Sequence, residues 1–329
     1  MAVIPGLWAD LLDTPALVVD LDVLERNIAT MVRATRERGV ALRPHVKTHK
    51  TPQIADMQRE YGAVGMTCAT LGEASMLAAA GHHDIFVAYP IWPGGPKGQL
   101  LRELSERVSL SVGLDSTESA AALGTAFRGQ ARALRVLVEV DVGGRRTGVR
   151  PADAGAIAVA AQRAGLDVLG VFTHGGHSYG LGAAARRAAH DEVVGLTVAV
   201  ESMQASGVPA RVVSAGSTPT ALLSAEGLVT EERPGTYVFG DRQQVTIGSC
   251  SAADIALTVI STVVSRAVPD QIVIDAGTKC LGREIQSWLD GYADIANWPS
   301  IRLTGLYDHH GVGVVPEGDP RPKVGSLLR

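Results

Sequence analysis

Short runs of apolar, mostly β-branched residues alternate along the first two thirds of the chain with longer amphipathic segments rich in Ala and Leu. Apolar runs of this length predict buried strands, and charges at helical spacing predict helices that cover a sheet. Helices are predicted at Asp22–Arg38, which Gly39 would end, and at Leu71–Ala80, which Gly81 would end. The predicted strands are Ala16–Asp20, Leu42–Lys47, Ala63–Thr67, Asp84–Tyr89, Ser109–Asp115, Leu134–Val142, Val168–His174 and Arg211–Ala215.

This alternation of strand and helix indicates parallel strands joined by right-handed crossovers, and eight such units are the number that closes a (β/α)8 TIM barrel. A doubly wound open sheet is the alternative. After about residue 245, Val, Ile and Thr alternate, as in Ile255–Val264 and Gln271–Asp275, with Gly and Pro between the runs. We therefore expect an α/β barrel at 13–245 and a smaller C-terminal β domain at 246–329, with residues 1–12 packed near it.

Composition narrows the class of function. The 329 residues carry a formal net charge of -4, which argues against a nucleic-acid-binding protein, because that class needs a concentrated basic surface. No uncharged apolar run reaches membrane-spanning length. The three cysteines, Cys68, Cys250 and Cys280, are odd in number and lack CxxC pairing, so we expect neither disulfides nor a zinc ribbon, and we expect a reducing, cytoplasmic location.

A basic segment, Arg43–Lys50, follows an apolar run and holds five basic side chains in eight residues. If the segment is a strand, Arg43, His45, Lys47 and His49 share one face. Neighbouring positive charge and partial burial both lower the pKa of a lysine, so Lys47 would present the neutral amine that forms an imine with an aldehyde or ketone. A solvated basic strand end is the alternative.

Polar and small residues follow three of the later predicted strands. Asp141–Gly148 is a glycine turn with two arginines, Thr173–Tyr179 holds two histidines, and Ser214–Thr220 is a hydroxyl-rich turn with a glycine. The last turn suits a phosphate, because backbone N–H groups and hydroxyls can point at the anion, although such turns are commonly ordinary loops. A lysine, a phosphate cradle, an arginine and a histidine at the strand ends of a barrel match the requirements of pyridoxal 5'-phosphate (PLP).

Several motifs together resemble the fold-type III PLP enzymes, the alanine racemase-like group, and within it the D-threonine aldolase and D-serine dehydratase family. The resemblance runs from about Asp13 to the C-terminus and implies PLP as the cofactor. The motifs that carry it are Arg43–Lys50, Cys68–Ala74, Asp84–Pro90, Gly170–His174, Gly216–Thr220 and Arg233–Phe239.

The resemblance implies a role for each matching position. Lys47 matches the lysine that binds PLP and later acts as a base at Cα, Arg146 matches an arginine near the phenolic oxygen, and His174 matches a histidine beside the ring. Lys47 and His174 are thus the implied catalytic residues. The other implied cofactor-binding residues are Gly216, Ser217, Thr218, Gly235 and Thr236 at the phosphate, Tyr237 as a pocket wall, and Arg233, which aligns with a racemase arginine that faces the pyridine nitrogen. Core packing or surface charge is the alternative for His174, Tyr237 and Arg146.

The family acts as a lyase on 3-hydroxy-D-amino acids. We favour the D-threonine aldolase reaction, a retro-aldol cleavage to glycine and an aldehyde, because Cys68–Ala80 and Gly235–Asp241 look most like bacterial D-threonine aldolase relatives. A D-serine dehydratase-like elimination, a racemase using Tyr292 or Tyr307, and a non-catalytic PLP carrier are the alternatives. The segment Asp275–Lys279 resembles a loop that reaches the partner subunit's active site, which implies a homodimer.

The resemblance also implies a divalent metal, Mn or Zn, beside PLP. The family's metal-binding motif follows a turn that resembles Val324–Ser326, and this chain reaches Arg329 without that motif. The adjacent His309 and His310 would point to opposite faces of a strand, so we assign no metal ligands. We expect that the chain is truncated or that the metal is absent, and that lyase activity is weak unless the missing end is supplied.

Overall fold

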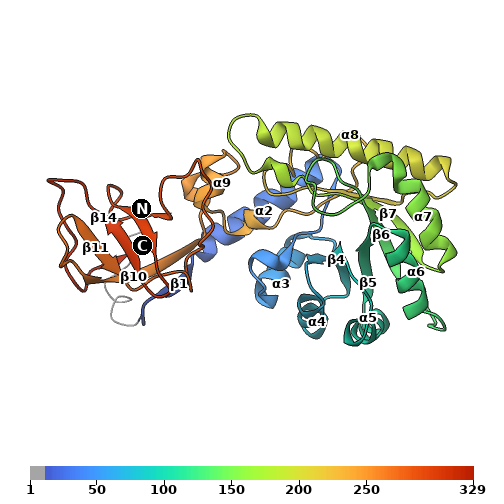
Figure 1. Cartoon of the computed structure of the whole chain (residues 1–329), viewed down its shortest axis with the longest axis horizontal. Coiled ribbons are helices and arrows are strands. Elements are labelled where there is room, and N and C mark those ends of the chain that lie inside the picture. Colours follow the sequence, from blue (N-terminus) through green and yellow to red (C-terminus); the bar gives the residue numbers. More distant parts are fainter. Residues whose placement is uncertain (1–11) are drawn as a thin grey trace. The chain divides into compact units, whose positions relative to one another are not determined.

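A computed structural model of the chain describes residues 12–329, which form two compact units (Figure 1). The larger unit is Glu25–Val238, and the smaller unit combines the described chain up to Leu24 with Phe239–Arg329. Most of the N-terminal segment that we expected to lie near the C-terminal domain is outside the described residues.

Eight parallel strands, in the order β2-β9-β8-β7-β6-β5-β4-β3, form the centre of the larger unit. They are β2 (Ala41–Leu42), β3 (Met66–Cys68), β4 (Asp84–Pro90), β5 (Ser109–Leu114), β6 (Arg135–Glu139), β7 (Asp167–Phe172), β8 (Val212–Ala215) and β9 (Glu231–Glu232). A parallel bridge between His45 and Thr67 joins the extension of β2 to β3 and closes the ring. The predicted α/β fold with an eight-stranded barrel is therefore confirmed.

Helices connect these strands and cover the outside of the ring, as Figure 1 shows for α5 to α8. None of the helices within residues 12–329 has both the length and the apolar character that a membrane crossing requires. The helices of the larger unit are α2 (Leu21–Glu37), which begins in the smaller unit, α3 (Pro52–Tyr61), α4 (Leu71–Ala79), α5 (Pro96–Arg107), α6 (Thr117–Ala126), α7 (Ala154–Arg163) and α8 (Ala184–Ala205), with short 3-10 turns η1 (Val46–Thr48), η2 (Pro151–Asp153), η3 (Gly176–Ser178) and η4 (Thr236–Val238).

One predicted barrel strand belongs to the other unit, and one barrel strand was not predicted. The segment predicted as the first barrel strand is β1 (Ala16–Val19), which pairs antiparallel with β10 of the smaller unit. The true last barrel strand, β9, was missed because its sequence is two glutamates, whereas our search was for apolar runs. The strand that precedes Lys47, β2, is the first strand of the barrel, and the hydroxyl-rich turn follows the seventh strand, β8.

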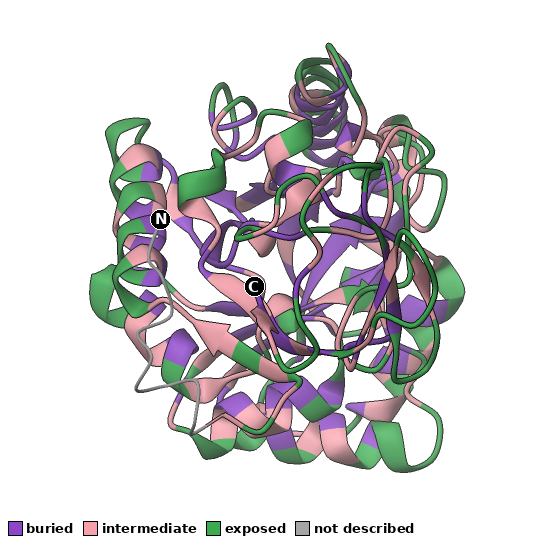
Figure 2. Ribbon diagram, turned by 90° about the vertical axis from the view of Figure 1, so that its left-hand side faces the viewer, coloured by how far each residue is buried: buried purple, intermediate pink, exposed green. Residues whose placement is uncertain are grey.

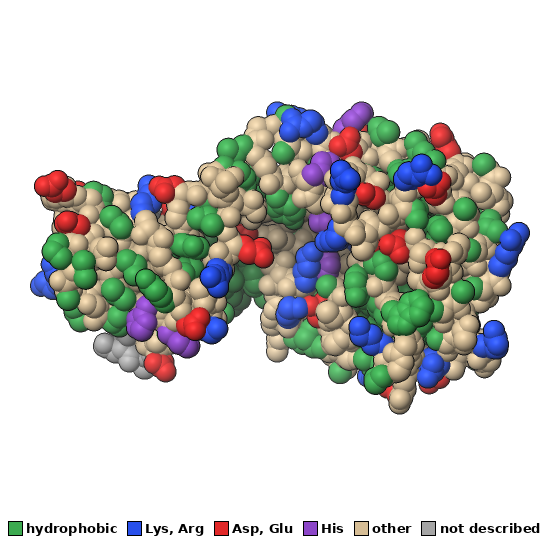
Figure 3. Space-filling view, in the orientation of Figure 1, with side chains coloured by type: hydrophobic (Ala, Val, Ile, Leu, Met, Phe, Trp, Pro, Cys, Tyr) green, Lys and Arg blue, Asp and Glu red, His purple; other side chains and the backbone are tan. Residues whose placement is uncertain are grey.

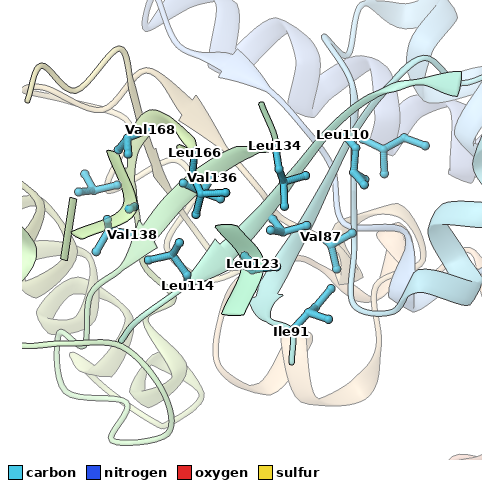
Figure 4. Packing of buried hydrophobic residues seen from close by; sticks show 14 of the residues in the cluster. Val87, Ile91, Leu110, Leu114, Leu123, Leu134, Val136, Val138, Leu166 and Val168 are labelled. Carbon is cyan, nitrogen blue, oxygen red and sulfur yellow. The ribbon is translucent and has the colours of Figure 1, made fainter. Parts of the chain in front are cut away.

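Strand alternation separates two hydrophobic layers in the barrel. Along β4, Ile85 and Val87 belong to the large cluster between strands and helices, whereas Phe86 belongs to a small cluster with Leu137 and Phe172. Figure 4 shows part of the large cluster, in which strand residues meet Leu123 of α6. Figure 2 shows that the exposed residues of the helices lie on their outer faces.

The smaller unit is an antiparallel sheet with strand order β1-β10-β11-β14-β13-β12, and β15 also pairs with β10. Its buried core is aliphatic and includes Val263, Ile272, Ile274, Ile301 and Leu303. The antiparallel β domain is confirmed, while its predicted limits stay a prediction. Its elements are β10 (Leu257–Ser265), β11 (Gln271–Ile274), β12 (Ala293–Asp294), β13 (Arg302–Leu306), β14 (Gly311–Val314), β15 (Leu327–Leu328), α9 (Arg242–Thr246) and η5 (Ala252–Asp254).

Candidate active site

A cavity of about 500 Å³ lies at the carboxyl ends of the barrel strands, where barrel enzymes hold their substrates. Basic side chains dominate its walls, and Figure 3 shows several Lys, Arg and His side chains gathered on one part of the larger unit. The structure brings together all the predicted site residues except Tyr237, namely Lys47, Arg146, His174, Gly216, Ser217, Thr218, Arg233, Gly235 and Thr236. The sequence analysis did not identify the remaining lining residues, which are His45, Ala88, Glu139, Phe172 and Tyr179.

Lys47 lies in the 3-10 turn η1 and not on a strand, which corrects the predicted alternation of its neighbours. The imidazole Nδ1 of His45 caps this turn by accepting the backbone N–H of Lys47 at 3.3 Å. Burial lowers the pKa of the Lys47 amine, and the positive charges of Arg146 and Arg233 lower it further, against the charge of Glu73. The direction of this shift agrees with the prediction, but its main cause is burial, and the charged neighbours follow other strands of the barrel.

Two other residues of the basic segment point away from the cavity. Arg43 donates to Asp84 Oδ1 at 2.7 Å and to Glu231 Oε2 at 2.9 Å, so it sits in a largely buried ion-pair network. The Nδ1 atom of His49 accepts the backbone N–H of Thr51 at 3.1 Å. Only His45 and Lys47 of this segment therefore face the cavity.

His174 follows β7 and lines the cavity beside the cations. Burial lowers its pKa to about 3, and the charges of Lys47, Arg146 and Arg233 act in the same direction. Burial and the same kind of neighbours also hold the pKa of His45 well below its usual range. Both imidazoles are therefore neutral near pH 7, and each can accept a hydrogen bond or a proton.

Arg233 forms part of the cavity wall directly after β9 and is buried. Its guanidinium donates to the hydroxyl of Ser214 and to the carbonyl of Thr173, and it lies 5.9 Å and 5.4 Å from the centres of the Phe86 and Phe172 rings. The Ser214 hydroxyl in turn donates to Glu231 at 2.6 Å. These contacts fix the orientation of the guanidinium, while four acidic neighbours offset the cost of burying its charge.

The hydroxyl-rich turn after β8 requires glycine at its first position. Gly216 has φ +93°, and a Cβ there would lie 1.8 Å from Glu232 Oε2. Ser217 is held within the turn, because its backbone N–H donates to Thr220 Oγ1 at 2.9 Å and its hydroxyl lies 3.0 Å from Ser178 Oγ. A Cβ on Gly235, across the cavity, would lie 2.9 Å from Thr48 Oγ1.

Only some polar groups of this cradle remain for a ligand. The backbone N–H of Gly216 donates to Glu192 Oε1 at 3.3 Å, and that of Ser217 is also used. Within residues 12–329, the backbone N–H groups of Thr218 and Gly235 have no hydrogen-bond partner. The hydroxyl of Thr218 accepts the N–H of Tyr237 at 3.1 Å, which leaves its proton free to donate. The groups of this cradle that remain free are thus hydrogen-bond donors, which suit an anion, and within the described chain no carboxylate of the cradle lines the cavity.

Tyr237 was predicted to form a pocket wall but is not among the cavity-lining residues. Its hydroxyl accepts a hydrogen bond from Gln58 Nε2 at 2.9 Å, and burial raises its pKa. Its backbone N–H supports Thr218, so its link to the cavity runs through that residue.

These residues suit PLP. A lysine amine biased toward its neutral form lies in the same cavity as free N–H and hydroxyl donors for a phosphate. No metal site has the same support. Within the described part of the chain, no three His, Cys, Asp or Glu residues come together, and His309 and His310 lie in an exposed turn of the smaller unit.

An eight-stranded barrel with such a cavity is the architecture of a fold-type III PLP protein. Comparison with known families supports this class: residues 19–243 match the alanine racemase N-terminal domain, and residues 256–329 match a putative serine dehydratase domain. The chain therefore belongs to the family of the alanine racemase N-terminal domain, combined with a D-serine dehydratase-like domain.

Individual relatives include both lyase types named in the sequence analysis. D-threo-3-hydroxyaspartate dehydratase from Delftia sp. (strain HT23) is 40% identical over 92% of this chain and 83% of its own length. D-threonine aldolase from Arthrobacter sp. is 32% identical over 99% of this chain and 86% of its own length. A solved metal-free mutant of D-threo-3-hydroxyaspartate dehydratase superimposes with a TM-score of 0.88 at 37% identity, covering 97% of this chain and 90% of the other. The family is thus one of PLP lyases that act on 3-hydroxy-D-amino acids.

Proposed function

We propose that this protein is a PLP-dependent lyase that removes water from a 3-hydroxy-D-amino acid. The observation that carries this proposal is the position of Lys47, whose amine lies in one cavity with the donor groups of the turn after β8. The choice of elimination is supported by the relatives, because the dehydratase is 40% identical and the aldolase 32%.

Different residues of the cavity would bind the cofactor and move the substrate proton. Thr218 and Gly235 offer donors to the phosphate, and Lys47 offers a neutral amine to the cofactor's aldehyde carbon. PLP, when bound, supplies an electron sink that stabilises negative charge at the substrate Cα. Lys47 would be the base that takes the Cα proton, because burial and the nearby arginines lower its pKa and so favour the neutral amine.

Substrate recognition falls to the cations of the cavity wall. Arg146 lines the cavity and its charge acts on Lys47, so its guanidinium is available to the phenolic oxygen of PLP, as the resemblance implies, or to a substrate carboxylate. His174 is neutral and lies in the same cavity, where its imidazole can accept a hydrogen bond from the substrate hydroxyl, and the proton that Lys47 takes from Cα is the one that the departing hydroxyl requires. No step here is assigned to a metal.

Aldol cleavage is the second candidate, supported by the segments Cys68–Ala80 and Gly235–Asp241, which look most like D-threonine aldolases. The same cavity serves both reactions, since the choice depends on which substrate bond is broken. We further propose a homodimer in which the segment Asp275–Lys279 approaches the partner's active site, and a cytoplasmic location.

The test is a product assay with D-threonine, D-serine and D-threo-3-hydroxyaspartate, each with and without Mn²⁺ or Zn²⁺. Elimination gives a 2-oxo acid and ammonia, aldol cleavage gives glycine and an aldehyde, and racemisation gives the L-isomer. Ammonia and 2-oxo acid in equal amounts are expected. Glycine as the main product would replace elimination with the aldolase reaction, and the L-isomer alone would overturn both.

A further inference from the structure

Two glutamates lie directly behind the turn that offers donors to the phosphate. Glu192 is on α8 and Glu232 is on β9, and both have 0% of their surface exposed. Neither lines the cavity. Two charged carboxyl groups so close to a bound anion would repel it and weaken its binding. Their presence behind this turn therefore points to a structural role.

Glu192 connects two loops of the site through a single oxygen atom. Its Oε1 accepts the backbone N–H of Gly175 at 2.8 Å and that of Gly216 at 3.3 Å. Gly175 follows His174, and Gly216 precedes Ser217. One carboxyl oxygen therefore sets the spacing between the loop after β7 and the loop after β8.

Glu232 supports the same turn from a different side. Its Oε1 accepts the hydroxyl proton of Ser224 at 2.9 Å, and its Oε2 occupies the place that a Cβ on Gly216 would need. The loop therefore has no room to relax toward β9. Within residues 12–329, the Oε2 atoms of Glu192 and Glu232 have no hydrogen-bond partner.

The charge on this pair is reduced. Burial raises the pKa of both carboxyl groups, and the charge of Glu192 raises the pKa of Glu232 further, to well above its usual range. Arg233 and the hydroxyls of Thr220 and Ser224 act in the opposite direction, and Glu231 adds to the rise for Glu232. The raised pKa biases Glu232 toward its neutral form, which repels a phosphate less than a full carboxylate charge would.

We propose that Glu192 is a positioning residue for the phosphate of PLP: it holds the turn after β8 and the loop that carries His174 at a fixed spacing, with Glu232 as the backing of Gly216. The proposal rests on the proposed function only in taking PLP as the ligand. It assigns an orientation role to a residue that touches neither cofactor nor substrate.

The experiment compares PLP with pyridoxal, which lacks the phosphate, on the cofactor-free protein. Glu192→Ala is expected to weaken PLP binding by about tenfold or more, because two backbone N–H groups lose a buried carboxyl acceptor. Pyridoxal binding is expected to change less than about twofold, since it does not use the turn. Fluorescence titration measures both affinities, and thermal unfolding without ligand reports any general loss of stability.

Two further variants separate positioning from folding. Glu192→Gln keeps a carbonyl oxygen that accepts both N–H groups and is expected to retain most of the PLP affinity, while Glu201→Ala, at an exposed position of α8, serves as the control. If Glu192→Ala does not fold, Glu192→Asp replaces it, because the shorter side chain withdraws the same acceptor.

Equal losses for PLP and pyridoxal, or an unchanged PLP affinity, would overturn the positioning role. Failure of the proposed function looks different. In that case the unaltered protein binds no PLP, and borohydride fixes none to Lys47.

Discussion

The interior of the barrel and the core of the antiparallel sheet are buried to a similar degree and are built from different kinds of residue. The sheet's core is aliphatic, with Ile272 and Val263 fully buried. The barrel interior has only a small apolar cluster around Phe86 and Phe172, and beside it lies the buried guanidinium of Arg233. The barrel's apolar burial lies mainly outside the ring, between strands and helices.

This difference indicates that aliphatic packing supplies the stability of the protein, whereas the charged interior of the barrel serves the chemistry of the site. Buried charges contribute little net stability, because their desolvation offsets their attraction, whereas aliphatic packing stabilises directly. The barrel can keep charges inside because its outer layer supplies the stability. Substitutions in the barrel interior should therefore change cofactor binding, and those in the sheet core should change stability alone.

The largest effect is expected for Lys47→Ala. Without the amine, PLP has no covalent attachment and the Cα proton has no base, so activity should fall by a factor on the order of 10³ or more. Borohydride reduction followed by peptide mass spectrometry tests the attachment. Lys97→Ala, at an exposed position of α5, is the control and should keep both attachment and activity.

The next largest effect is expected for Arg43→Met, which should lower the free energy of unfolding. It leaves the buried carboxyl group of Glu231 without its ion-pair partner, which costs about 3–5 kcal/mol of unfolding free energy. Urea unfolding measures the loss. A loss below about 1 kcal/mol would show that the ion pair is dispensable, as at exposed sites.

Ile272→Val in the sheet core should lower the unfolding free energy by about 1 kcal/mol, because one buried methylene is removed. The affinity for PLP should be unchanged, since this residue belongs to the other unit. A parallel decrease in PLP affinity would contradict the division of roles between the two units. Urea unfolding and fluorescence titration on the same sample test both parts.

The pH response of His174 is expected to have the smallest effect near neutral pH, and this effect grows as the pH falls. Its folded pKa is lowered to about 3, so below about pH 6.5 the unfolded chain takes up a proton that the folded protein does not. This residue therefore contributes a loss of stability as the pH falls from 6.5 toward 3. His174→Gln should unfold at a lower pH than the unaltered protein, as followed by circular dichroism. An unchanged acid transition would show that His174 is protonated in the folded state.

Much of the fold followed from the sequence, because strands such as β4 to β8 are apolar runs between amphipathic helices. The pattern failed at β9, where burial of Glu231 depends on Arg43, a partner distant in sequence. Pattern also misplaced Lys47, since the chain leaves the strand at the short turn η1. Alternation fails wherever tertiary partners, and not side-chain polarity, decide burial.

The site was predictable where a motif marked it. Glu139 carried an unused signal, because it ends an apolar strand in register with the inward-facing Leu137. The sequence around Glu192 carried no such signal. This residue lies on a long amphipathic helix where an acid is ordinary, and only the folded chain shows that its side chain meets Gly175 and Gly216.

The seam of the barrel has a dynamic consequence. Between the β2 and β3 segments the ring is held by the bridge from His45 to Thr67 and by three hydrogen bonds: the Thr67 amide donates to the Pro44 carbonyl, the Val64 amide to the Leu42 carbonyl, and the Thr67 hydroxyl to the Arg43 carbonyl. A strand pair with so few hydrogen bonds opens locally more often than the longer strand pairs do. The Thr67 amide should therefore exchange with deuterium early. A ligand attached to Lys47, shortly after β2, would stabilise one side of this junction, and its binding should slow that exchange.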